Sequence, residues 1–414
     1  MIHSKDLRAE VSASRQHGLD LVRAAAIIFV MLYHANNMML IARGGSSLIA
    51  FGWMDVDLFF VLSGYLIGGQ LLKQCTNGSR PDYFRFFTRR ALRTIPAFAA
   101  VLTVYLLFPA LRETPNLQPL WQYCTFTMNL VPDSRPGAFN QVWSLCVEEH
   151  FYLLFPLGLV ILSKKPSVRT TSAVLFGLIA AGIVVRAFLW LALVAKSPFD
   201  PGSVSNWQTY VTLIYRPTWS RLDGLLAGVA LAALKTFRPL LWARFVSRPN
   251  LILAGGVAGI GLAISLFSSS LSPVVSAAFG FPLLSASGAL IVAAASTGCG
   301  AIGKIRVPGG QALATGAYSL YLTHKLAFHA TQVWIAPALG VSEAGALALA
   351  LIAAILLATI LYWTVERPFL MLRERLEQRG AARRGRNIGQ NTLTDLIPIF
   401  PISARSRVLE QNPA

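Results

Sequence analysis

Charged residues are scarce in this 414-residue sequence, where Asp, Glu, Lys and Arg together make up only 13% of the chain. Soluble globular domains contain about 25% of these residues, so the composition argues against a soluble protein. Hydrophobic residues reach 55%, and several apolar runs are long enough to cross a bilayer. These proportions predict an all-α, polytopic integral membrane protein.

Acidic residues are the rarer of the two charged classes, with 18 Asp and Glu against 36 Lys and Arg. In a soluble protein the resulting net charge of +18 would indicate a nucleic-acid partner, but here the basic residues alternate between loops. Segments assigned to the cytoplasm hold 27 Lys and Arg, and the opposite segments hold 6. The positive-inside rule therefore predicts that both termini are cytoplasmic, and no nucleic-acid partner is expected.

About ten transmembrane helices are predicted from the positions of the apolar runs, which lie near residues 19–41, 52–73, 91–111, 142–163, 172–195, 219–235, 250–268, 273–297, 311–336 and 344–366. The chain is accordingly divided into a cytoplasmic segment 1–18, a ten-helix membrane domain 19–367 and a basic cytoplasmic tail 368–414. Two outer connections, near residues 112–141 and 196–218, are long enough either to cover an outward-facing cleft or to serve as plain connectors.

Several patterns with known chemistry are missing. The four cysteines form no CxxC pair and no disulfide framework, although a Cys124–Cys146 bridge is left open, and no metal site is predicted. Ser63 has no nucleophile-elbow setting, which favours a packing role for it. No internal repeat is visible, which argues against a transporter built from inverted halves.

The most informative stretch is LDLVRAAAIIFVMLYH, from Leu19 to His34, which is apolar except for Asp20, Arg23 and His34. Arg23 and His34 are eleven residues apart, which at about 100° per residue is close to three helical turns. The two side chains are therefore expected on one helix face, about 16 Å apart along the axis. Ionisable groups inside a membrane are costly and usually functional, whereas the alternative is a pair of polar packing residues.

Other ionisable side chains also fall within or beside apolar spans. Asp57 lies near the outer start of the second span, and His324 lies near the middle of the ninth. Glu148 and Glu149 lie just inside the outer end of the fourth span. Adjacent helical residues point about 100° apart, so we expect Glu148 or Glu149, but not both, to face a central site. Asp57, Glu149 and His324 are candidate substrate-binding residues.

Three arginines, Arg89, Arg90 and Arg93, open the third span. By themselves they are typical of a topology signal, but together with Arg23 they are able to bind phosphate groups. Two pairs of neighbouring charged residues also lie at the ends of predicted spans. They are Arg221 with Asp223, and Glu366 with Arg367 in the Glu366-Arg367-Pro368 sequence. Each pair is expected to be either a local charge pair at a helix end or part of a site.

The chain resembles the membrane-bound acyltransferase family 3, which includes O-antigen, exopolysaccharide and nodulation-factor O-acetyltransferases and macrolide acyltransferases. The resemblance covers about residues 15–370 and depends on features that recur in order: the Arg-x10-His spacing, FFVLSGYLI, RRALRTIP, WSLCVEEHFY, SRLDGLLAG, YSLYLTH and the terminal ERP. This ordered set is far more specific than any single motif.

The resemblance implies ten helices in the cytoplasmic (inner) membrane, an acyl-CoA donor and transfer to a hydroxyl, usually on a carbohydrate or glycosylated acceptor. Acetyl-CoA is the expected co-substrate, and no tightly bound cofactor is expected. Family roles carry over to Arg23 as a donor-binding residue and to His34 and Glu148 as catalytic residues. His150 stands where the family commonly has glutamine, so it receives no role.

The reaction needs deprotonation of the attacking hydroxyl and stabilisation of an oxyanion. His34 is suited to be the general base, or alternatively to carry the acyl group itself. Glu148 is expected to orient the imidazole or to bind the acceptor. Acceptor acylation is expected from the opposite side of the membrane from CoA, and the alternatives are modification of a macrolide sugar at the inner face or a glycan or lipid transporter.

Overall fold

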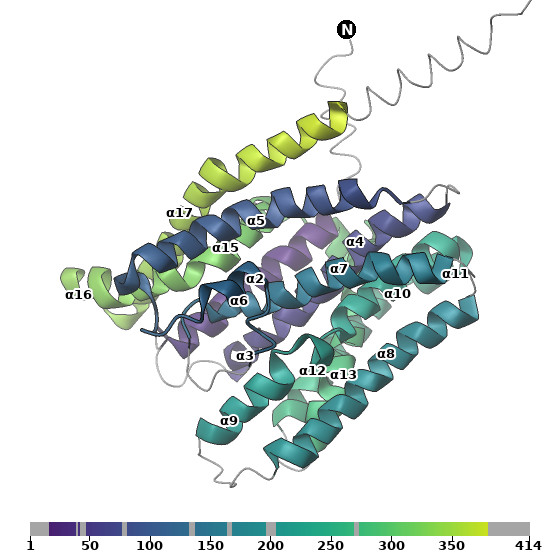
Figure 1. Cartoon of the computed structure of the whole chain (residues 1–414), viewed down its shortest axis with the longest axis horizontal. Coiled ribbons are helices and arrows are strands. Elements are labelled where there is room, and N and C mark those ends of the chain that lie inside the picture. The colour runs from purple at the N-terminus through teal and green to yellow at the C-terminus, as the bar shows by residue number, and fades with distance from the viewer. Residues whose placement is uncertain are drawn as a thin grey trace, which may run out of the picture.

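The computed structural model describes residues 16–38, 40–41, 47–76, 81–131, 137–163, 168–195, 204–268 and 273–379. Within these residues the chain is all-helical and contains no strand (Figure 1). The predicted cytoplasmic position of the two termini stays a prediction, since residues 1–15 and 380–414 lie outside the described part.

Each of the ten predicted stretches contains a long helix. These helices are α2 (His17–Asn37), α4 (Asp55–Thr76), α5 (Tyr83–Leu107), α7 (Trp143–Ser163), α8 (Val168–Leu189), α10 (Asp223–Phe237), α12 (Pro249–Ser268), α13 (Pro273–Ala295), α15 (Gly310–Ala330) and α17 (Glu343–Leu361). Shorter helices connect them, namely α3 (Ser47–Ala50), α6 (Leu120–Cys124), α9 (Val204–Tyr210), α11 (Pro239–Phe245), α14 (Gly300–Lys304) and α16 (Ala336–Leu339).

Among the described residues, eight helices are long and apolar enough to span a membrane, or nine if α10 and α11 form one span bent by 118°. The chain is therefore a multi-pass membrane protein. The predicted segment 311–336 is helical but is not one of these spans. Its helix, α15, carries buried polar side chains such as Thr323, His324 and Lys325, which lower its hydropathy. The last candidate span continues to Arg379, so the start of the predicted tail is helical.

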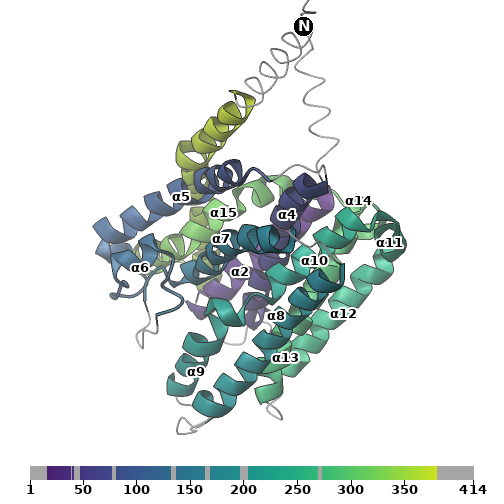
Figure 2. The same cartoon turned by 45° about the vertical axis from the view of Figure 1, so that its right-hand side comes forward.

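Helix α2 lies in the interior of the bundle, packed against α4, α13 and α15 (Figures 1 and 2). Helices α8, α10, α12 and α13 are grouped on one side of it, and α5, α15 and α17 on the other (Figure 2). Helices α4 and α10 approach closely because both carry glycine at the contact. A Cβ atom at Gly64 would lie 2.1 Å from the Leu225 carbonyl oxygen, and one at Gly228 would lie 2.2 Å from that of Val61.

Two buried ion pairs join the helices, and they correct the expectation of a local Arg221–Asp223 pair. Arg221 donates from Nη2 to Asp57 on α4 at 2.7 Å, while Asp223 on α10 accepts from Arg186 on α8 at 2.6 Å. All four side chains are almost fully buried. Charged side chains in an apolar interior need partners, and helix packing brings these partners from distant parts of the sequence.

The expectation of a local Glu366–Arg367 pair is also wrong. Glu366 is buried and accepts a hydrogen bond from Ser319 on α15 at 2.6 Å. Arg367 lies instead over the ring of Trp363, with Cζ 4.1 Å from the ring centroid. The Cys124–Cys146 bridge, which the sequence left open, does not form, since both residues are free thiols.

Candidate active site

Helix α2 contributes to two separate cavities, one near each end. Arg23 lines a cavity of about 210 Å³, here called the arginine cavity, whose polar lining includes Ser63, Arg90, Arg93, Glu148 and Tyr152. His34 lines a second cavity of about 530 Å³, here called the histidine cavity, whose polar lining includes Asn37, Glu113, Asn140, Gln141 and Lys325. The predicted sharing of one helix face thus places the cation and the imidazole in neighbouring cavities.

The arginine cavity gathers three of the four predicted donor-binding arginines. Arg23 comes from α2, where its Nη1 lies 3.6 Å from Asp20 Oδ1. Arg90 and Arg93 come from successive turns of α5. Arg89 is not among the lining residues, because its guanidinium is hydrogen-bonded to both carboxylate oxygens of Glu377. The structure therefore separates Arg89 from the other three.

A chain of hydroxyl groups links Glu148 to α4 within the arginine cavity. The Tyr152 hydroxyl donates to Glu148 Oε2 at 3.0 Å and lies 2.5 Å from Ser63 Oγ. Because the single tyrosine proton is directed to the carboxylate, Ser63 is the donor to the tyrosine oxygen. The Arg90 guanidinium lies over the Tyr152 ring at 4.7 Å from its centroid. Ser63, which its sequence context assigned to packing, thus belongs to the polar lining of a cavity.

The histidine cavity combines aromatic rings with amide side chains. Its aromatic lining comprises Tyr33, Trp53, Trp143, Trp207, Tyr215 and Tyr321, and its amides are Asn37, Asn140, Gln141 and Gln332. Both of the long connections that were predicted at the outer face contribute to it, the first through Glu113 and Asn140 and the second through Trp207 and Tyr215. The two connections therefore line a cleft, as one of the two interpretations of the sequence expected.

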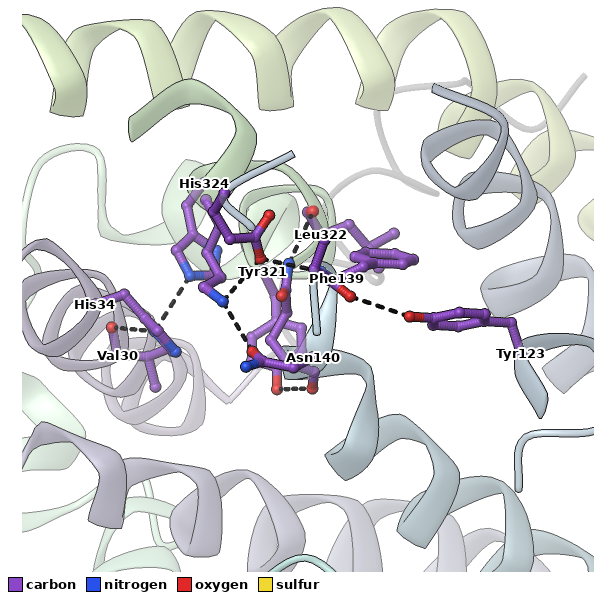
Figure 3. A network of polar contacts seen from close by, with 12 residues as sticks. Val30, His34, Tyr123, Phe139, Asn140, Tyr321, Leu322 and His324 are labelled. Atoms are coloured by element: carbon purple, nitrogen blue, oxygen red, sulfur yellow. Dashed lines mark hydrogen bonds and ion pairs between the residues drawn. The ribbon is translucent and has the colours of Figure 1, made fainter. Parts of the chain in front are cut away.

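His34 is held by a second histidine, His324 of α15 (Figure 3). His34 Nδ1 lies 3.2 Å from His324 Nε2 and 2.9 Å from the carbonyl oxygen of Val30. His324 Nδ1 lies 3.0 Å from the carbonyl oxygen of Leu320. His324 is fully buried, whereas His34 reaches the cavity. The residue predicted to bind substrate is thus a direct neighbour of the predicted base.

These contacts fix the tautomers of both rings. A carbonyl oxygen only accepts, so each Nδ1 that faces one carries a proton. In neutral His324 this leaves Nε2 as an acceptor, and His34 Nδ1–H is shared between that nitrogen and the Val30 carbonyl. In neutral His34 the lone pair is then on Nε2. The arrangement leaves this atom able to take a proton.

Lys325, the residue after His324, is a site residue that was not predicted from the sequence. Its ammonium donates to Glu113 Oε1 at 2.9 Å and to Asn140 Oδ1 at 2.8 Å, and Glu113 Oε1 also accepts from the Phe139 amide at 3.0 Å. Burial opposes ionisation of Glu113, but the Lys325 ammonium and these hydrogen bonds hold its pKa below the ordinary value. A lone lysine in a predicted apolar span was the available signal.

The remaining predicted residues fall in different places. Glu148, which was expected to orient the His34 imidazole or to bind the acceptor, lines the arginine cavity and not the histidine cavity. The side chain that contacts the His34 imidazole is His324. Glu149 lines neither cavity, consistent with the expected divergence of adjacent side chains. Asp57 also lines neither, because its carboxylate is used in the buried pair with Arg221.

The family model described as "Acyltransferase domain" matches residues 16–363 of the chain. Two curated relatives illustrate the similarity. The O-acetyltransferase OatA of Staphylococcus aureus is 27% identical over 265 residues, which cover 60% of this chain and 40% of the relative. The peptidoglycan O-acetyltransferase OatA of Listeria monocytogenes is 28% identical over 239 residues, covering 54% of this chain and 34% of the relative.

These alignments cover well under half of each relative, so the similarity concerns one part of those proteins. No solved structure gives a significant match to this chain. The part of the chain that the family model matches contains α2, α7 and α15, which carry Arg23, His34, Glu148 and His324.

Proposed function

The chain belongs to the acyltransferase family whose domain matches residues 16–363, and from this premise we propose that it is a membrane O-acetyltransferase acting on a glycan. The proposed reaction moves an acetyl group from acetyl-CoA to a sugar hydroxyl, with donor and acceptor on opposite sides of the membrane. The observation that carries the proposal is the division of α2 between an arginine-lined and a histidine-lined cavity.

Arg23, Arg90 and Arg93 are suited to hold the phosphates of CoA. Their guanidinium groups come from two helices and line one cavity. Arginine binds phosphate through planar, paired hydrogen bonds, and its charge is permanent. Tyr152 supports this role because its ring lies against the Arg90 guanidinium, and Glu148 accepts a hydrogen bond from Tyr152 in the same cavity. The apolar part of the lining, which includes Phe59, Phe60 and Ile67, suits the rest of the donor arm.

The spacing along α2 matches the length of such a donor. Arg23 and His34 are separated by eleven residues, about 16 Å of helix rise and roughly half of a hydrocarbon core about 30 Å thick. An extended pantetheine arm has a similar reach. A CoA molecule held by its phosphates at Arg23 can therefore present its thioester near His34 while the nucleotide stays at the membrane face.

The lining of the histidine cavity supports a carbohydrate acceptor. Trp53, Trp143 and Trp207 offer flat apolar faces on which the C–H faces of a sugar ring can pack. Asn140 and Gln141 offer both hydrogen-bond donors and acceptors, which match the mixed requirements of sugar hydroxyls.

The proposed chemistry uses His34 as the general base. Nε2 takes the proton of the acceptor hydroxyl as the oxygen attacks the thioester carbonyl, and the developing imidazolium is stabilised by the Val30 carbonyl and His324 Nε2. The C–S bond then breaks, and the CoA thiolate takes the proton from His34 to give free CoA and the ester. The Lys325 ammonium in the same cavity supplies positive charge near the oxyanion.

Replacement of Arg23 by lysine tests the donor site. Lysine keeps the charge but loses the planar, paired geometry, so we expect Arg23→Lys to raise the apparent KM for acetyl-CoA by about tenfold, equivalent to about 1.4 kcal/mol. The matched control is Arg89→Lys, because Arg89 pairs with Glu377 outside the cavity. Unchanged donor kinetics in both Arg23→Lys and Arg23→Ala would show that Arg23 does not bind the phosphates.

A further inference from the structure

Two residues, Val56 of α4 and Tyr321 of α15, line both cavities. Tyr321 is 8% exposed and Val56 is 6% exposed, so both side chains are largely enclosed by protein. Their position on both linings places them where the arginine cavity and the histidine cavity meet. Neither residue was predicted to belong to a site.

The Tyr321 ring is fixed at this boundary by its hydroxyl group. The hydroxyl donates to the carbonyl oxygen of Gln141 at 2.7 Å and lies 2.6 Å from Ser144 Oγ. Gln141 lines the histidine cavity, and Ser144 lines the arginine cavity. The tyrosine is therefore held to residues on both sides of the boundary, one just before the start of α7 and one in its first turn.

The same ring is close to the histidine pair. The ring centroids of Tyr321 and His324 are 6.1 Å apart, and those of His324 and His34 are 4.9 Å apart. An acyl group that starts in the arginine cavity and reacts at His34 must pass the boundary next to these rings. A side chain fixed by two hydrogen bonds and close packing resists displacement more than a free one does.

We propose that Tyr321, backed by Val56, is the partition between the donor and acceptor cavities and determines the size of the acyl group that reaches His34. The proposal rests on the proposed function, because it takes the arginine cavity as the donor site. Its physical basis is the shared lining of Tyr321 and Val56 together with the hydrogen bonds that hold the tyrosine hydroxyl.

The partition can be tested without any enzymatic activity. In a variant in which all four native cysteines are replaced by alanine, Ser63→Cys places one thiol on the wall of the arginine cavity. A membrane-impermeant methanethiosulfonate reagent is then added to one side or the other of sealed vesicles. Because the cavities lie toward opposite ends of α2, we expect modification from one side only while Tyr321 is present, and from both sides after Tyr321→Ala.

The labelling experiment has two outcomes that contradict the partition. One is modification from both sides in the presence of Tyr321, and the other is one-sided modification that persists in Tyr321→Ala. Should Tyr321→Ala fail to accumulate in the membrane, Tyr321→Val is examined in the same way. Tyr321→Phe keeps the ring and removes only its two hydrogen bonds, so it is expected to remain largely one-sided.

The size selection is tested by competition between acetyl-CoA and butyryl-CoA. Tyr321→Ala is expected to raise the ratio of butyryl to acetyl transfer by about tenfold or more, since a pocket that discriminates one methylene commonly does so by about 10–200-fold. The matched control is Tyr318→Ala. Tyr318 lies one turn earlier on α15, lines only the arginine cavity and donates to the Thr94 carbonyl, so its removal should leave the ratio unchanged.

An unchanged ratio in Tyr321→Ala, or an equal shift in Tyr318→Ala, would overturn the size selection. These results differ from failure of the proposed function. If the unaltered protein transfers no acyl group from any acyl-CoA, the donor assignment is wrong, while the thiol labelling still decides whether Tyr321 separates the two cavities.

Discussion

Replacement of His34 by alanine is expected to abolish acyl transfer while the protein still accumulates in the membrane. The imidazole of His34 reaches the histidine cavity with Nε2 unprotonated, because Nδ1 is committed to the Val30 carbonyl and to His324. Loss of a general base commonly costs about 10²–10⁴-fold in rate. The measurement is the initial rate of label transfer from acyl-CoA to acceptor at matched protein level.

Two further variants make the His34 result specific. His150→Gln is the matched control, because His150 lines neither cavity and contacts Thr218, a bond that glutamine can replace. His324→Ala removes only a positioning residue, so we expect a smaller loss together with a shift in the pH dependence of transfer. If His34→Ala retained most of the activity, His34 would have no role in the mechanism.

Replacement of Arg186 by methionine is expected to destabilise the folded protein strongly. Arg186 is fully buried and donates to both carboxylate oxygens of Asp223 as well as to the carbonyls of Ser220 and Ala278. Removing one partner of such a pair leaves the other charge buried and costs about 3–5 kcal/mol. The measurement is thermal unfolding of the purified protein in detergent, followed by intrinsic fluorescence.

The double variant Arg186→Met with Asp223→Leu is the control for this experiment. Since it removes both charges, much of the lost stability should return, because replacing a whole buried ion pair by apolar side chains is often close to neutral. If the single variant unfolds at the same temperature as the unaltered protein, the ion pair between α8 and α10 contributes little to the stability of the fold.

The positions of the helices and the shared helix face of Arg23 and His34 could be predicted because they depend on local sequence. Apolar runs set the positions of the helices, and an eleven-residue spacing sets the shared face of α2. Cavities are different, because they form between helices. That Arg23 and His34 line separate cavities depends on the packing of α4, α7 and α15 around α2, which no local pattern specifies.

The partners of the ionisable residues were the least predictable feature. Asp57 pairs with Arg221 across 164 positions, and His34 contacts His324 across 290. Arg221 and Asp223 are close in sequence, yet each finds its partner on another helix, since the bundle offers fully buried carboxylate and guanidinium groups there. Sequence proximity therefore favoured the wrong pairs, while the ionisable character of these residues in apolar surroundings correctly marked them as constrained.

Sealed vesicles separate the two sides of the membrane, so they show whether an acyl group passes from CoA on one side to a glycan on the other through the two cavities. Inside-out vesicles are prepared from bacterial cells that produce either this protein or His34→Ala, so that the envelope glycans of the cell are trapped in the lumen. Acetyl-CoA labelled in the acetyl group is added outside. We expect labelled glycan in the lumen of vesicles with the unaltered protein and none with His34→Ala. Label that reaches a glycan only after the vesicles are broken, when donor and acceptor share one compartment, would contradict this expectation.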